Sequence, residues 1–124
     1  LVDLEARFES MHVGVTVWLD RRIDEVEQTD GSRIGYRLGY TKIDNRWRIA
    51  TKRVRKSYSH HEGDPETVYE DFDTISDPVP LSAAPRSVRV EAATLFDQLI
   101  EKLTAKVTRF IDNIDEAKRA VRDE

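Results

Sequence analysis

The chain has 124 residues, of which 39% are apolar and 35% are charged, and its formal net charge is −4. It contains no cysteine, which excludes disulfides and thiolate zinc sites, and no apolar run approaches the roughly 20 residues that cross a bilayer. Length and composition predict one domain, residues 1–124, in a cytoplasmic protein with no membrane partner. The start at Leu1 leaves open whether residues precede it.

The charge is distributed unevenly along the chain. Residues 33–61 carry nine Lys/Arg and one acid, whereas residues 62–77 carry seven Asp/Glu and no base. Antiparallel strands of opposite charge stabilise each other when they are neighbours. We therefore expect the acidic segment to lie beside a strand at 46–56 and to mask its bases.

An amphipathic helix is predicted from about residue 2 to residue 27. Apolar residues recur there at spacings of three and four, namely Leu4, Phe8, Met11, Val15, Trp18, Leu19, Ile23 and Val26. The alternation of Val13, Val15 and Val17 is equally typical of a short strand. The sequence leaves open whether residues 13–19 are helix or strand.

A sheet is predicted over about residues 33–73. Tyr36, Leu38 and Tyr40 alternate with polar or small residues, and Asp44-Asn45 predicts a two-residue hairpin turn because both residues tolerate positive φ. The second strand is expected from about 46 to 56. Residues 60–65 are expected to form a loop and Thr67–Asp73 a third strand.

The C-terminal part is predicted to be a Pro-rich connection, residues 76–85, and a long helix, residues 86–122. Helical spacing of apolar residues continues throughout that range, so one continuous helix would span about 55 Å. The expected fold is α+β: an N-terminal helix, a three-stranded antiparallel β-meander and a long C-terminal helix packed on the sheet. The expected core is Tyr36, Leu38, Tyr40, Trp47, Ile49, Leu95, Leu99 and Leu103.

No motif of catalysis or of cofactor binding is present. The sequence lacks a Gly-x-Ser-x-Gly elbow, a phosphate-binding glycine loop and a dinucleotide fingerprint. His60, His61, Glu62 and Asp64 have the side chains of metal ligands, but adjacent residues of an extended chain point to opposite sides. We therefore predict a non-enzymatic protein without catalytic residues, metal or cofactor.

Four bases of the predicted hairpin share one face and are candidate contacts for an anion or a nucleic acid: Arg37, Arg46, Arg48 and Lys52. Gly35 and Gly39 on the same face, with Ala50 opposite, leave a shallow track. We interpret this track as a site where another element of the same chain packs. Masking by the acidic segment would compete with nucleic acid.

Surplus helix surface suggests a function. A long helix cannot bury its whole stripe on a small sheet, so the second half is predicted to form a protein interface through Val107, Phe110, Ile114, Ala117 and Val121. The competing explanation is that the N-terminal helix folds back and covers it. The leading hypothesis is a protein-interaction or assembly module that binds another protein or a second copy as a homodimer. The alternative is a nucleic-acid-binding module that uses the hairpin at 33–56.

Overall fold

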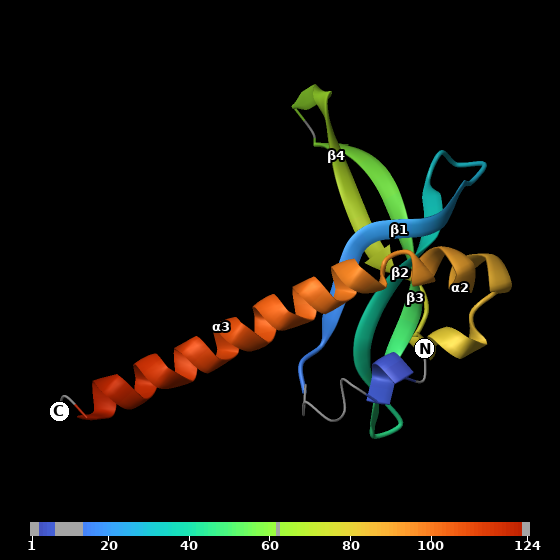
Figure 1. Cartoon of the computed structure of the whole chain (residues 1–124). Helices are drawn as coiled ribbons and strands as arrows, with labels where there is room; N and C mark the ends of the chain where they lie inside the picture. Colours follow the sequence, from blue (N-terminus) through green and yellow to red (C-terminus); the bar gives the residue numbers. More distant parts are fainter. Residues whose placement is uncertain (1–2, 7–13, 62, 123–124) are drawn as a thin grey trace.

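The architecture is an antiparallel sheet with helices packed against one of its faces, an α+β fold (Figure 1). The structure is a computed structural model and describes residues 3–6, 14–61 and 63–122. Its strands are β1 (Val17–Glu27), β2 (Arg33–Ile43), β3 (Arg46–His61), β4 (Asp64–Thr74) and β5 (Val79–Pro80). Its helical elements are residues 3–6, the short η1 (Leu81–Ala83), α2 (Arg86–Ala93) and α3 (Phe96–Arg122).

The strands form a meander in which each pairs with the next along the chain, in the order β1-β2-β3-β4, with β5 added beside β3. The predicted turn between β2 and β3 is confirmed, because Asp44 and Asn45 have φ values of 49° and 66°. A two-residue turn at Asp44-Asn45 dictates the register of β2 with β3, and Tyr40 accordingly pairs with Ile49 and Arg37 with Lys52.

The prediction of a helix over residues 2–27 is wrong for its second half. Residues 3–6 are helical, residues 7–13 lie outside the described part, and Val17–Glu27 is strand β1. Register shifts interrupt its pairing with β2 between Trp18 and Arg22 and again after Ile23, and Asp24 has a φ of 53°. The buried residues Val17, Leu19 and Ile23 keep the even spacing of a strand, but Arg21 is exposed, so the four-residue interval from Leu19 to Ile23 also fits a helix.

The sheet has more strands than the three predicted. β3 continues to His61 and β4 begins at Asp64, so most of the predicted loop at 60–65 belongs to strands that meet at Gly63, which has a φ of 91°. β4 pairs with Val54–His61. The acidic segment therefore lies beside the second half of β3 and overlaps the predicted 46–56 strand only at its end.

The predicted long helix is two helices. α2 ends at Ala93, and Thr94 places its hydroxyl 2.6 Å from the carbonyl oxygen of Glu91, a local hydrogen bond that competes with helix continuation. The amide of Leu95 donates to the oxygen of Ala92, three residues earlier, and α3 begins at the next residue. The 27 residues of α3 span about 40 Å.

The core lies between the helices and one face of the sheet. Six of the eight predicted core residues are buried, while Tyr36 and Trp47 are partly buried against them. β1 contributes Val17, Leu19 and Ile23, which face α2 and α3. Leu19 and Ile23 belong to the apolar stripe that predicted a helix. The rest of the core comes from η1, α2 and the segment between them: Leu81, Ala84, Val88 and Ala92.

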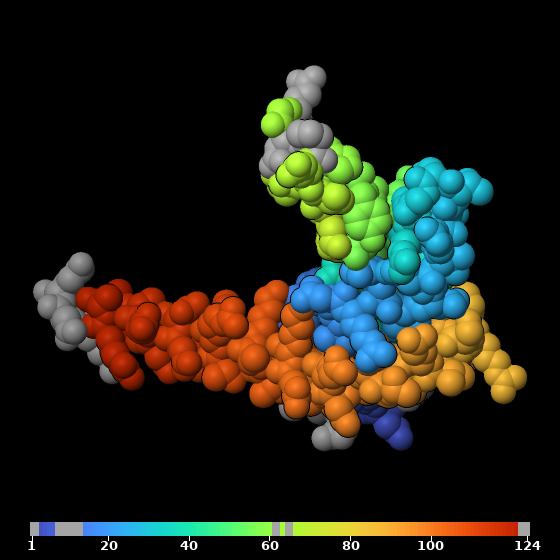
Figure 2. Space-filling view, turned by 90° about the horizontal axis from the view of Figure 1, so that it is seen from above, coloured from blue at the N-terminus to red at the C-terminus, as the bar shows by residue number. Residues whose placement is uncertain are grey.

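Two parts of the chain project from this body (Figures 1 and 2). One is the far end of the β3–β4 hairpin. The other is the second half of α3, residues 108–121, which we call the stem. Figure 1 shows the stem as a single helix that extends from the body, and Figure 2 shows that the stem projects away from the sheet.

Candidate functional site

The stem is exposed along its entire length. Every residue from 108 to 121 is exposed, including Phe110 at 57%, Ile111 at 51% and Val121 at 72%. These side chains continue the stripe that is buried earlier in the same helix, where Leu99 is fully buried. One amphipathic face is thus covered by the sheet in the first half of α3 and open in the second.

The predicted interface residues lie on this open stripe. Val107 is partly buried against the core, and the other four, Phe110, Ile114, Ala117 and Val121, are exposed. Ile114, Ala117, Lys118 and Val121 lie together on one open side of the stem. The fold-back alternative is wrong for residues 17–27, which form β1, while residues 7–13 of the predicted helix lie outside the described part of the chain.

Two lysines fasten α3 to the sheet just before the stem begins. The ammonium of Lys102 donates to the backbone oxygen of Trp18, and that of Lys106 donates to the oxygen of Thr16. Lys102 also lies 3.9 Å from a carboxylate oxygen of Asp20. These contacts place the end of the anchored half of the helix at the start of β1.

The four predicted anion contacts share the sheet face opposite the helices, which we call the outer face. Arg37 lies opposite Lys52 in the β2–β3 register, and Arg46 and Arg48 follow on the same face of β3. Arg48 lies 3.9 Å from Glu5, whereas Arg46 is exposed. The hairpin therefore brings these residues to one surface, as its pattern predicts.

The masking of these bases differs from the prediction. Arg37 pairs with Asp20 of β1 at 3.1 Å and also donates to the oxygen of Leu19 at 2.7 Å. Within the described residues, Glu70 is the acid of the 62–77 segment that forms an ion pair, at 3.1 Å from Lys56. That contact raises the pKa of Lys56. The acids that reach the predicted bases come mainly from β1 and from Glu5.

Two outer-face residues of β1, Trp18 and Arg22, were missed from the sequence. Trp18 lies on Gly39 so closely that a Cβ there would overlap its ring, which confirms the expectation that the glycine track is filled by the same chain. Arg22 of β1 pairs with Arg37, and its guanidinium lies 5.1 Å from the ring centre of Phe72. The sequence signal for both was the strand-like alternation of Val13, Val15 and Val17 that leads into β1.

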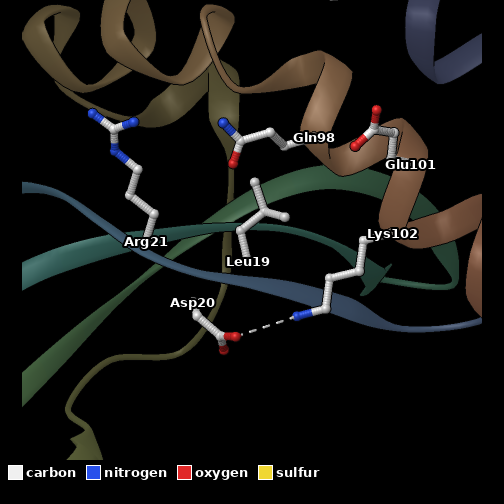
Figure 3. Close-up of a pocket in the computed structure, with 6 residues that line it drawn as sticks. All are labelled: Leu19, Asp20, Arg21, Gln98, Glu101 and Lys102. Carbon is white, nitrogen blue, oxygen red and sulfur yellow. Dashed lines mark ion pairs between the residues drawn. The ribbon is translucent and has the colours of Figure 1, made fainter.

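A hollow between β1 and α3 carries mixed charges (Figure 3). It measures about 450 Å³ and is lined by Leu19, Asp20, Arg21, Gln98, Glu101 and Lys102. The Asp20–Lys102 ion pair crosses it. Two acids and two bases balance each other at its wall, so the hollow selects no charge class of ligand.

The predicted metal-ligand types near residue 60 are spread along two strands. His60 lies opposite Val68 in the β3–β4 pairing, and Glu62 lies outside the described residues. Among the residues that the structure describes, no three His, Asp or Glu side chains are grouped to hold a metal ion. Within the same ranges, no helix combines the length and apolar character needed to traverse a bilayer.

Comparisons of the chain with protein-family models, curated protein sequences and solved structures gave no match. In the described part of the molecule, the stem and the outer face are the two surfaces with features of a binding site.

Proposed function

We propose that the protein is a non-enzymatic association module and that its stem pairs with the stem of a second copy. The observation that carries the proposal is the exposure of every residue from 108 to 121 on a helix whose apolar stripe continues past the body. Apolar surface left in water forgoes about 25 cal/mol for each Å² that a partner could bury.

A second copy is the occupant that the pattern favours. Val107, Phe110, Ile114, Ala117 and Val121 are spaced alternately by three and four residues, the a and d spacing of a coiled coil. Such a seam is complementary to itself, because two identical stripes can interlock knobs into holes.

The two stems would pair antiparallel. The sheet covers the same stripe of α3 in residues 96–107, so a parallel partner would place its own residues 96–107 where β1 lies. In the antiparallel arrangement the two bodies lie at opposite ends of the paired stems. The stem is only about 20 Å long, so we expect dissociation constants in roughly the micromolar range or weaker.

The test is the mass of the protein in solution, measured by sedimentation equilibrium at concentrations up to about 1 mM. We expect a concentration-dependent dimer that becomes a folded monomer in the double variant Phe110→Glu, Ile114→Glu. The matched control is Thr108→Glu, Arg119→Gln, which changes the net charge by the same amount on the opposite side of the helix and should still dimerise.

A monomer at every concentration would contradict self-association. Global unfolding of an already monomeric double variant would assign Phe110 and Ile114 to the core of a single chain. A mass that rises only when another protein is added would replace the second copy with a different partner.

A further inference from the structure

Three cations stand side by side across three strands of the outer face. Arg22 of β1 pairs with Arg37 of β2, and Arg37 pairs with Lys52 of β3. Directly opposed like charges on neighbouring strands destabilise a sheet unless an anion relieves them. In this fold the three cations nevertheless lie directly opposite one another.

The relief within the chain is uneven. Arg22 has an ion pair with Glu25, and Arg37 has one with Asp20, whose side chain is 91% exposed. Lys52 has no carboxylate partner among the residues that the structure describes; its ammonium lies 4.3 Å from the ring centre of Trp18. Burial, together with the charge of Arg37, lowers the pKa of Lys52. The positive charge of the row is therefore only partly compensated by carboxylates of the described residues.

Exposed aromatic rings lie next to the row. Phe72 is 51% exposed, and its ring centre is 5.1 Å from Arg22 and 5.9 Å from Lys56. Tyr58 is 47% exposed, with Lys56 5.5 Å from its ring centre. The bases and rings alternate along the second half of β3 and its partner β4. Phe72 also lines a hollow of about 240 Å³ with Asp20, Arg22 and Arg37.

We propose that the outer face binds single-stranded nucleic acid, with phosphates at Arg22, Arg37 and Lys52 and bases stacked on Phe72 and Tyr58. Cations that follow a backbone beside rings that accept unpaired bases are the general means of binding single strands. A duplex keeps its bases stacked within itself and would gain only the charge contacts. This activity is separate from the association of stems.

The dimensions fit a short strand. Tyr58 follows Lys52 by six residues on β3, which is about 20 Å along the strand. A site of this length accommodates a few nucleotides of a single strand. Asp20 limits the affinity, because its carboxylate occupies Arg37 and must be displaced by a phosphate.

The experiment is a fluorescence-anisotropy titration of the intact chain with an oligothymidylate of about 12 nucleotides, at two salt concentrations of about 50 and 200 mM. A duplex of the same length and free thymidine monophosphate are the comparison ligands. We expect the single strand to bind most tightly and to weaken as salt increases. The variant Arg37→Ala, Lys52→Ala should weaken binding by at least about tenfold, and Phe72→Ala by about tenfold.

Two further variants separate a specific site from general charge. Arg86→Ala, Arg89→Ala removes the same charge from α2, which lies against the opposite face, and should change the affinity by less than about twofold. Asp20→Asn should tighten binding by about two- to fivefold at low salt, because it frees Arg37 from its own carboxylate. This exposed substitution tests the site even if the double alanine variant fails to fold.

Four results would overturn the proposal. These are no binding of the single strand at low salt, equal loss of affinity in the α2 control, equal binding of duplex with no effect of Phe72→Ala, and binding of the free nucleotide alone. An Asp20→Asn variant that binds no more tightly than the unmodified chain would also contradict the assigned role of Arg37.

Discussion

The two halves of α3 have the same kind of sequence and opposite surroundings. In residues 96–107 the apolar stripe faces β1 and β2, and Leu99 and Leu103 are 0% and 2% exposed. In residues 108–121 the stripe is as regular, but Phe110 is 57% exposed. Helical periodicity therefore identifies the apolar face of a helix. The extent of the sheet decides how much of that face is buried within one chain.

The boundary between the halves coincides with the start of β1. Lys102 and Lys106 donate to backbone oxygens of Trp18 and Thr16, where that strand begins. Among the described residues, no strand lies beneath the helix beyond this point. The stem thus depends on its own backbone hydrogen bonds for stability, and an isolated helix of this length is marginal in water. A second stem would stabilise it.

The largest expected contrast between the halves comes from truncating one apolar residue in each. Leu99→Ala should lower the free energy of unfolding by about 2–5 kcal/mol, because it leaves a cavity in a fully buried site. Ile114→Ala should lower it by less than about 0.5 kcal/mol in the monomer. Urea unfolding of dilute protein measures both, and a similar loss for the two variants would show that the stem is buried in a single chain.

A smaller contrast is expected for two lysines of α3. Lys102→Met removes the hydrogen bond to Trp18 and should cost about 1 kcal/mol, since the side chain is partly exposed. Lys118→Met on the stem is the control and should have almost no effect on the unfolding of the monomer. If Lys102→Met is as neutral as Lys118→Met, the lysine does not anchor the helix.

The smallest expected effect is a loss of folding stability at low pH, and it arises from Glu25 in the body of the protein. Burial tends to raise the pKa of Glu25, but hydrogen bonds and charges from Arg22 and Arg33 outweigh it and hold the pKa below its ordinary value of 4.5. The stability from Glu25 is therefore present above about pH 4.5 and is lost as the pH falls through the lower pKa of the folded state.

Glu25→Gln tests this pH dependence. The variant should be less stable than the unmodified protein at pH 7 by at most about 1 kcal/mol, and this difference should vanish in acid. Denaturant unfolding at the two pH values measures it. A difference that persists at low pH would assign the effect of the substitution to packing rather than to charge.

The hairpin and the stem could be predicted from the sequence because their signals are local. Asp44-Asn45 specifies a turn through backbone conformation alone, and the register of β2 with β3 follows from it. The exposed stripe follows from helical spacing and length. Both depend on neighbouring residues and not on the rest of the fold.

β1 could not be predicted in the same way, because its pattern depends on contacts with β2. Leu19 and Ile23 lie four residues apart on the core side, an interval that fits both a strand and a helix, and the register shifts against β2 have no local signal in the sequence. The error extended to the outer face. Arg22 and Trp18 reach Arg37 and Gly39 only when β1 is a strand, so the row of three cations was hidden in the sequence.

Amide hydrogen exchange of the intact chain at increasing protein concentration tests the account of the stem most directly. We expect amides of residues 96–107 to be protected at every concentration, because the sheet covers that half of α3. Amides of residues 108–121 should exchange rapidly in dilute protein and become protected as the concentration increases and stems pair. Stem amides that exchange at one rate across the whole concentration range would contradict pairing of stems.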